Sequence, residues 1–242
     1  MNKNIIIRSV CAYLSDKLGC SPEELSGSGT VYVPNRTAEP PFLQLAAVGE
    51  RVIVSASPEL LPRVKELTEG RSRDEIFELP LVYGQTIHFI PDSIPDMPLP
   101  EGYEYILLEG DAIGERSGLE GFPNSLAFDE NGHTGTGIVF FARSGDGIAA
   151  LAGAGQEAPG LWEMGVDTDP AHRGRGLGAA LTARLARELM RRERAPFYSA
   201  SVTNIGSQSV AHRAGLRPLW VDTYSNTLLE DYIYKDITVN RG

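Results

Sequence analysis

Apolar positions along this chain follow two periods, and each period predicts a different kind of element. Near the N-terminus they recur every three to four residues, which indicates a helix over about residues 4–18. Short apolar runs bounded by polar residues and glycines are typical of strands, which we expect at 30–33, 42–48 and 51–55. Gly49-Glu50 separates the last two runs and predicts a tight turn, so these two strands form a hairpin.

The boundary between the two halves of the chain is indicated by helix-start and proline signals. Ser57-Pro58-Glu59 has the order of an N-cap residue, a first-turn proline and an acid, which predicts a helix to about Thr68. Four prolines lie within residues 91–100, a density that excludes a helix or a central strand. We place a linker there, between an N-terminal α/β region (1–95) and a second domain (96–242). A long loop within one continuous fold explains the prolines equally well.

The second half contains further strands, followed by a long helix. The strands are expected at 103–108, 137–142, 148–154 and 162–168, and the turn 144–147 makes a hairpin of the second and third. Residues 109–135 are rich in glycine and give no assignment beyond one or two short helices. On the last strand, Glu163 and Asp167 share one face, while Met164 and Val166 share the other.

Composition excludes several classes of protein. Apolar residues make up 42% and charged residues 22%, which is ordinary for a globular protein. Cys11 and Cys20 match no zinc or redox spacing, and two thiols are too few for a disulfide framework. No apolar run approaches the roughly 18 residues of a membrane span. We therefore expect a soluble, reduced, cytoplasmic protein that binds neither a metal nor a membrane.

The charge is distributed unevenly along the chain. The net charge of −10 argues against a nucleic-acid binder. Residues 1–150 hold 11 Lys and Arg against 22 Asp and Glu, whereas residues 151–242 hold 11 against 10, ten of the basic residues being Arg. The acidic part would suit a cationic substrate, or it serves solubility alone. The Arg-rich part is suited to contact phosphates.

The most informative segment follows the strand 162–168. A glycine-rich turn, 169–176, leads into a helix in which Leu177, Leu181, Leu185 and Leu189 repeat every four residues. The first amides of a helix have no internal partner, and the helix dipole favours an anion at that end. Glycines leave those amides accessible, and Arg173 and Arg175 add positive charge. The turn therefore predicts a pyrophosphate site.

Two well-known phosphate loops fit this turn poorly. A Walker A loop needs Gly-Lys-Ser/Thr, which is absent. The dinucleotide pattern GxGxxG/A is met formally by Gly174, Gly176 and Ala179, but the next strand ends in Thr203-Asn204 instead of an acid. Only 64 residues follow Gly178, too few for the rest of a doubly wound sheet.

A third phosphate loop fits in register. The segment resembles the GCN5-related N-acetyltransferase (GNAT) superfamily, whose loop reads Arg/Gln-x-x-Gly-x-Gly/Ala and is filled here by Arg173, Gly176 and Gly178. The second signature of the superfamily is an Asn, a small residue or Ser three positions later, and a helix closed by Gly. The chain resembles it at Asn204, Ser207 and Gly215. One bacterial subgroup, which has an extra N-terminal region, shows a similar pattern of residues. Its members here are Glu163, Thr168-Asp169-Pro170, Asn204 and Ser207. The resemblance is close over 161–220 and looser over 101–235. It implies a mixed, mostly antiparallel twisted sheet flanked by helices, preceded by an N-terminal α/β extension.

The resemblance also implies roles for individual residues. Acetyl-CoA would be the cosubstrate, without a metal. Its binding residues would be Val166, Thr168, Arg173, Gly174, Arg175, Gly176, Leu177, Gly178, Ala179, Asn204 and Ser207. The general base would be Glu163, with Asp167 as the alternative, since both lie on the strand before the loop. A plain helix cap explains Asn204 or Ser207 as well.

The usual general acid of the family is a Tyr, and its position is Ala211 here. This departure leaves Ser207, His212, Tyr198, Tyr224 or water to protonate the leaving thiolate.

The function implied is therefore transfer of an acetyl group from acetyl-CoA to a primary amine of a small molecule or peptide, by a monomer or homodimer. An acyl-CoA-binding regulator with the same fold and no turnover is the alternative, which the missing Tyr favours slightly. A dinucleotide-dependent oxidoreductase is a distant third.

Overall fold

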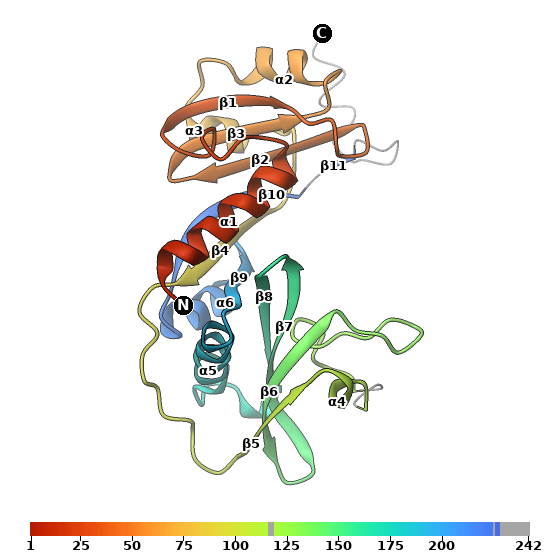
Figure 1. The fold of residues 1–242 in the computed structure, drawn as a ribbon, viewed down its shortest axis with the longest axis vertical. Coiled ribbons are helices and arrows are strands. Elements are labelled where there is room, and N and C mark those ends of the chain that lie inside the picture. The colour runs from red at the N-terminus through yellow and green to blue at the C-terminus, as the bar shows by residue number, and fades with distance from the viewer. Residues whose placement is uncertain (116–118, 225, 228–242) are drawn as a thin grey trace. The chain divides into compact units, whose positions relative to one another are not determined.

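The computed structural model describes residues 1–115, 119–224 and 226–227 (Figure 1). The chain forms two compact units, each built from two separate segments. Unit 1 combines Met1–Ser9 with Phe89–Pro218, and unit 2 combines Val10–His88 with the segment that begins at Leu219. The division falls within α1 (Lys3–Leu18), β4 (Gln85–Pro91) and β10 (Leu216–Thr223). It does not follow the single boundary predicted at residue 95, because each unit takes in a segment from the other half of the sequence.

The proline-rich stretch lies inside unit 1. After β4, residues 92–103 have no regular structure, yet they are held by hydrogen bonds. The amides of Asp92 and Ser93 both donate to the carbonyl oxygen of Gly215, at 3.1 and 3.2 Å. Arg187 donates to the carboxylate of Asp96 and to the carbonyl oxygen of Ile94. Of the two interpretations of the prolines, the structure therefore supports a loop packed within one compact unit.

Unit 1 is an antiparallel meander extended by one parallel strand. Its strands are β5 (Glu104–Glu109), β6 (Thr136–Ser144), β7 (Gly147–Ala158), β8 (Leu161–Thr168) and β9 (Ala195–Ser201). They lie in the order β9-β8-β7-β6-β5. All neighbouring pairs are antiparallel except β8 and β9, which are parallel.

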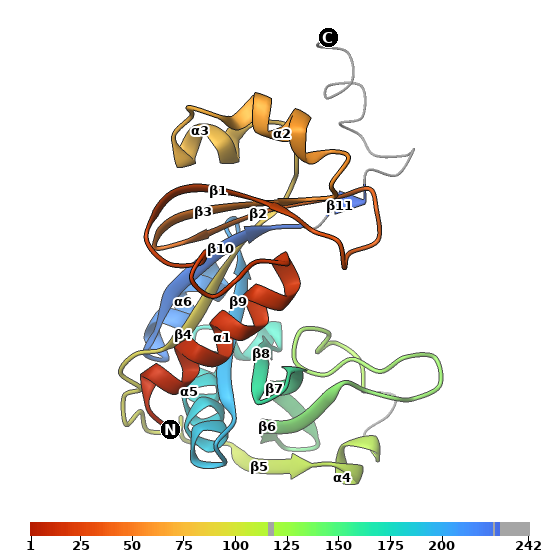
Figure 2. The same ribbon diagram turned by 45° about the horizontal axis from the view of Figure 1, so that its top comes forward.

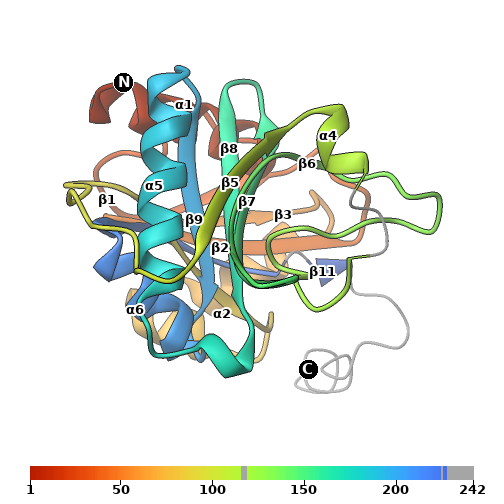
Figure 3. The same cartoon turned by 90° about the horizontal axis from the view of Figure 1, so that it is seen from below.

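The two faces of this sheet are covered differently. The helix α5 (Leu177–Arg191) packs against β7 and β8 and runs along the strands (Figure 3), and its predicted leucine stripe at 177, 181, 185 and 189 is at most 1% exposed. The opposite face packs against the segment around α4 (Asp111–Gly114). There the core consists of Ile113, Phe122, Leu126, Val139, Phe141 and Leu151. Two shorter helices, η1 (Pro170–His172) and α6 (Ile205–Arg213), flank α5 in the chain.

Unit 2 is a smaller α/β layer. Its strands are β1 (Ser28–Pro34), β2 (Phe42–Val48), β3 (Glu50–Ala56), the end of β10 and β11 (Asn226–Thr227). The order is β1-β3-β2-β10, with β1 and β3 parallel and the other pairs antiparallel. The helices α2 (Leu61–Thr68) and α3 (Arg73–Glu78) lie on one side of these strands and bury Val64 and Ile76 against them (Figure 2).

Two local predictions in unit 2 had different outcomes. The hairpin of β2 and β3 is confirmed, and Gly49 at its turn has φ 58°, a conformation that glycine adopts without strain. The predicted helix start at Ser57 is wrong, because the helix begins at Leu61. The Ser57 hydroxyl instead accepts a hydrogen bond from the Phe42 amide at 2.6 Å, so it joins the ends of β2 and β3.

The predicted fold class is confirmed by this architecture. Strand pairing in both units is mixed and mostly antiparallel, and helices flank the strands. Within the described residues, no helix is long and apolar enough to cross a membrane. The same residues contain no group of three or more His, Cys, Asp or Glu side chains placed to hold a metal ion.

Candidate functional site

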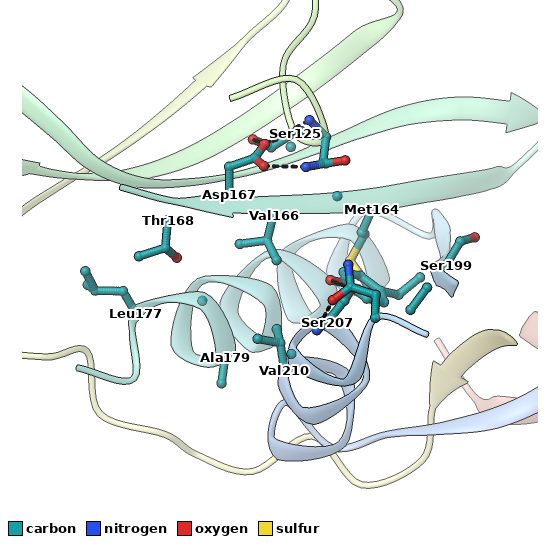
Figure 4. Close-up of a pocket in the computed structure, with 18 of the residues that line it drawn as sticks. Ser125, Met164, Val166, Asp167, Thr168, Leu177, Ala179, Ser199, Ser207 and Val210 are labelled. Carbon is teal, nitrogen blue, oxygen red and sulfur yellow. Dashed lines mark hydrogen bonds between the residues drawn. The ribbon is translucent and has the colours of Figure 1, made fainter. Parts of the chain in front are cut away.

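The site is an opening between β8 and β9 in unit 1. The two strands pair only from Leu161 with Ala195 to Met164 with Tyr198. Beyond that point, β8 continues to Thr168 without a described partner on its β9 side. The separation produces a cleft of about 1350 Å³ that also borders α5 and α6 (Figure 4). Parallel strands that diverge leave main-chain groups unpaired, so this edge of β8 is available to a ligand.

The turn after β8 is shaped by local hydrogen bonds and glycines. Asp169 caps η1 by accepting a hydrogen bond from the Ala171 amide at 2.8 Å. Gly174 and Gly176 follow with φ of 75° and 82°, in the left-handed region that side chains disfavour. Gly176 is the N-cap of α5, and no side chain caps this helix. The glycines therefore let the chain turn into α5 without covering its first amides.

Those amides form an anion cradle. In the described part of the chain, no acceptor is found for the amides of residues 174–179, and the first bonded amide of α5 is that of Ala180. A Cβ added at Gly174 or Gly176 would meet nothing within 4 Å, so the space in front of the amides is open. Arg173 lines the cleft, and its Nε donates to the Thr168 carbonyl oxygen at 3.2 Å. The geometry suits a pyrophosphate, because unpaired amides, the helix dipole and a guanidinium all favour negative charge.

The structure brings together ten of the eleven residues predicted to bind the cofactor. These ten line the one cleft: Val166, Thr168, Arg173, Gly174, Gly176, Leu177, Gly178, Ala179, Asn204 and Ser207. The exception is Arg175, whose guanidinium donates to the Tyr103 hydroxyl at 3.2 Å and to the Ala171 carbonyl oxygen at 3.3 Å. The Tyr103 hydroxyl also lies 3.0 Å from Nδ1 of His172. Arg175 thus contributes charge beside the cradle rather than a wall of the cleft.

Asp167, the alternative base, is engaged by protein donors. Its carboxylate accepts hydrogen bonds from the Asn124 amide, the Ser125 amide and the Ser125 hydroxyl, at 2.9, 2.9 and 2.7 Å. The Asn124 side chain adds a fourth bond at 2.5 Å. Figure 4 shows Asp167 and Ser125 on one side of β8, with Val166 and Thr168 on the other. Asp167 therefore anchors the loop that contains Asn124 and Ser125.

Two facing glycines make room for that loop. Gly153 of β7 is paired with Gly165 of β8. A Cβ at Gly153 would lie 1.8 Å from the Ser125 carbonyl oxygen, and one at Gly165 would lie 1.7 Å from that of Asn124. This contact is not among those predicted from the sequence. Glycines within adjacent strands mark a close approach of another backbone, and this was the signal that could have indicated it.

Glu163 is the carboxylate in the cleft that keeps its oxygens available. It is half-buried, lines the cleft, and lies opposite Gly155 of β7 and Phe197 of β9. Among the described residues, no hydrogen bond or ion pair to Glu163 is found. It occupies the last pair but one before β8 and β9 separate. A carboxylate in that place can accept a proton from a group that enters the cleft.

The beginning of α6 forms the far wall. Asn204 is its N-cap, and its Oδ1 accepts from the Ser207 amide at 3.0 Å, as a plain capping role predicts. The Ser207 hydroxyl is 2.7 Å from the Tyr198 hydroxyl. Burial raises the pKa of the Tyr198 phenol above its ordinary value, and the bond to Ser207 only partly opposes this.

The remaining acid candidates fall outside this wall. Ala211, at the usual Tyr position, is fully buried, and His212 is exposed and does not line the cleft. Tyr224 is not among the residues that line the cleft. Ser207 and Tyr198 are therefore the two hydroxyl candidates that the structure places at the cleft.

The fold is that of an α/β protein in which a cleft opens between two separating strands, beside the uncapped start of a helix. Residues 122–219 match the family model of GNAT acetyltransferase, a range that runs from the Asp167-anchored loop to β10. Over these residues the chain is therefore similar to the GNAT acetyltransferase family, the resemblance that its two motifs predict. A comparison with proteins of curated function gives no match.

Several solved structures that are described as GNAT proteins are also similar. An acetyltransferase of the GNAT family from Novosphingobium aromaticivorans is 23% identical, with a TM-score of 0.46 over 59% of this chain and 64% of that chain. A GCN5-related N-acetyltransferase-like protein from Streptococcus suis is 17% identical, with a TM-score of 0.47 over 88% and 97%. A tandem GNAT protein from the clavulanic acid biosynthesis pathway is 14% identical, with a TM-score of 0.45 over 93% and 95%. Thus the chain spans slightly under two thirds of the length of the first of these.

Proposed function

We propose that this protein is an acetyl-CoA-dependent N-acetyltransferase that transfers the acetyl group directly to a primary amine. The observation that carries the proposal is the cradle of unpaired amides at 174–179, which opens on the same cleft as Glu163. The match of residues 122–219 to the GNAT acetyltransferase model supports acyl transfer in general. We add to this that acetyl-CoA is the acyl donor and that an amine is the acceptor.

The residues present fit the donor. The amides of 174–179 and Arg173 would hold the pyrophosphate, and the open space at Gly174 and Gly176 leaves room for it. The unpaired edge of β8 at Val166 and Thr168 would hydrogen-bond the pantetheine arm, and Asn204 and Ser207 would border it. When bound, acetyl-CoA would supply an acetyl group activated as a thioester.

Glu163 would prepare the acceptor for attack. An alkyl ammonium has an ordinary pKa of about 10.4, so at neutral pH it must lose a proton before its nitrogen can attack a carbonyl. Glu163 would accept that proton, directly or through a water molecule, and its negative charge would attract the ammonium beforehand. Asp167 is less suited to this role, because four protein hydrogen bonds already occupy its carboxylate.

The acceptor that suits this site is cationic. The excess of 22 Asp and Glu over 11 Lys and Arg in residues 1–150 supports a positively charged small molecule or peptide. A cytoplasmic location and a monomeric or homodimeric state stay predictions.

Two measurements test the proposed function. Acetyl-CoA at 100 times its Kd should stabilise the protein by about 2.7 kcal/mol, measured as a rise in Tm, while NADH and ATP should not. Release of free thiol should then be followed across a panel of polyamines, aminoglycosides, amino acids and peptides. A rise in Tm with NADH or ATP but not with acetyl-CoA would overturn the proposal. Stabilisation by acetyl-CoA without thiol release for any amine would favour the acyl-CoA-binding regulator instead.

A further inference from the structure

Two hydroxyl groups meet where β8 and β9 stop pairing. Tyr198 is the last residue of β9 paired with β8, opposite Met164. Its phenolic oxygen lies 2.7 Å from the Ser207 hydroxyl oxygen, and either atom can be the donor. Both residues line the cleft, but Tyr198 is only 3% exposed whereas Ser207 is half-buried. Ser207 therefore faces the cleft, and Tyr198 lies behind it.

The position of Ser207 is fixed by its helix. The Asn204 side chain caps α6 through the Ser207 amide. One turn further on, the Gln208 side chain donates to the carbonyl oxygens of Ser201 and Val202, at 3.0 and 2.9 Å. The first turn of α6 is thus capped by Asn204 and tied to the end of β9 through Gln208. A hydroxyl held in this way loses little further freedom when it bonds a ligand.

Of the two hydroxyls, the phenol is the stronger acid. A Tyr phenol has an ordinary pKa of about 10, and a buried one keeps its proton at neutral pH. The Tyr198 phenol is buried, and its ring packs edge-on against Phe89 at 6.5 Å between centroids. It therefore remains a proton donor behind Ser207 across the pH range in which an amine would be acetylated.

We propose that Ser207 donates the proton to the departing sulfur, and that Tyr198 replaces that proton through the hydroxyl–hydroxyl bond. This inference rests on the proposed function. As the new carbon–nitrogen bond forms, the carbon–sulfur bond breaks, and its electron pair remains on sulfur. Ser207 gives its hydroxyl proton to that sulfur and takes the proton of Tyr198. Glu163 removes the proton of the amine and passes it to solvent, and a proton from solvent returns to Tyr198 through the Ser207 hydroxyl.

The experiment uses binding, so it needs no acceptor. The Kd of CoA and of desulfo-CoA, which lacks the sulfur, is measured by calorimetry from about pH 7 to about pH 9.5, a range that spans the ordinary thiol pKa of about 8.5. The proteins are the wild type, Ser207→Ala and Tyr198→Phe. The control is Tyr105→Phe, which removes a phenol bonded at 2.6 Å to the Pro100 carbonyl oxygen, outside the cleft lining. The Tm of each variant is measured in parallel.

The ratio of the two Kd values reports the bond to sulfur. For the wild type and Tyr105→Phe, the preference for CoA over desulfo-CoA should rise about ten-fold as the thiol ionises, because a hydroxyl bonded to a thiolate is charge-assisted. The rise should vanish in Ser207→Ala. It should fall to about three-fold in Tyr198→Phe, where Ser207 loses the donor behind it.

Three results would overturn the inference, and they differ in what else they affect. If the ratio of the two Kd values does not change with pH in the wild type, although both ligands bind, then Ser207 is not the proton donor. The proposed function is unaffected by that result. If the preference for CoA rises with pH as much in Tyr198→Phe as in the wild type, then Tyr198 does not supply a proton to Ser207. Binding of neither ligand overturns the inference together with the proposed function.

Discussion

The two sides of β8 are built from different chemical groups. On the side of α5, the cleft presents main-chain amides, glycines and small apolar side chains such as Val166. On the opposite side it presents carboxylates, those of Glu163 and Asp167. One side therefore attracts negative charge and the other attracts positive charge, although they are separated by the thickness of one strand.

The difference between these sides extends to how their polar groups are satisfied. The amides of 174–179 lack protein partners in the described residues, whereas Asp167 has four donors. The first amides of a helix have no partner within it, and here they face open space, so they are available to a ligand. On the carboxylate side, the unengaged group is Glu163. The comparison thus singles out one functional element per side, and substitutions on each side test it.

The largest effect is expected on the carboxylate side. Glu163→Gln keeps the size of the side chain but removes its basicity, so kcat/KM should fall by a factor of about 10² to 10⁴ with Tm almost unchanged. The measurement is kcat/KM against pH with an identified amine. Glu104→Gln, which changes an exposed carboxylate paired with Arg143 on β5 and β6, serves as the control. A wild-type pH profile in Glu163→Gln would show that another group is the base.

The next effect is expected on the amide side. Gly176→Asp should weaken CoA binding about 100-fold, because a carboxylate would occupy the open space and repel the pyrophosphate. Gly176→Asn is the matched control, since Asn has a similar shape, tolerates the left-handed φ of 82° and carries no charge. It should bind CoA within several-fold of the wild type. Equal loss in both variants would mean that shape, not charge, excludes the ligand.

A smaller effect is expected where the carboxylate side supports the loop. Asp167→Ala leaves the Asn124 and Ser125 donors without their acceptor, so the free energy of unfolding should fall by about 2 kcal/mol. Affinity for CoA should stay near the wild-type value, because Asp167 lies on the opposite side of β8 from Val166 and Thr168. Denaturant unfolding and calorimetry measure the two quantities. A loss of CoA affinity without a loss of stability would contradict the division into two sides.

The smallest effect concerns the capped helix. α6 begins with the side chain of Asn204, whereas α5 begins without any side-chain cap. Asn204→Ala should therefore lower the free energy of unfolding by about 1 kcal/mol. Ser209→Ala, on the same helix, removes a hydroxyl bonded to the Ile205 carbonyl oxygen and should change stability by less. Stability of Asn204→Ala equal to that of Ser209→Ala would show that the cap contributes little.

The sequence predicted those parts of the site that depend on local order. The leucine repeat of α5, the glycines of the turn and the alternation along β8 place ten predicted residues around one cleft. Local signals could not predict contacts between distant segments. The loop anchored by Asp167 is more than 40 residues away in sequence, and the close approach of Gly165 to Asn124 depends on folding. Ser57 precedes Pro58 and Glu59, an order typical of a helix start, so local sequence predicts a cap. Its bond to Phe42 forms only when β2 and β3 pair, and local sequence does not show that pairing.

The pairing of β2 with β10 has a consequence for synthesis on the ribosome. Val48 of β2 lies beside Trp220 of β10, so their partnership spans roughly 170 residues of sequence. At about 5–20 residues per second, translation leaves one edge of β2 unpaired for roughly 10–35 s after β3 has joined the other edge. The nascent chain therefore carries an open, apolar strand edge that includes Leu43 and Leu45 for most of its elongation. Chaperones that hold such edges should shift the yield of folded protein more during translation than during refolding of the finished chain.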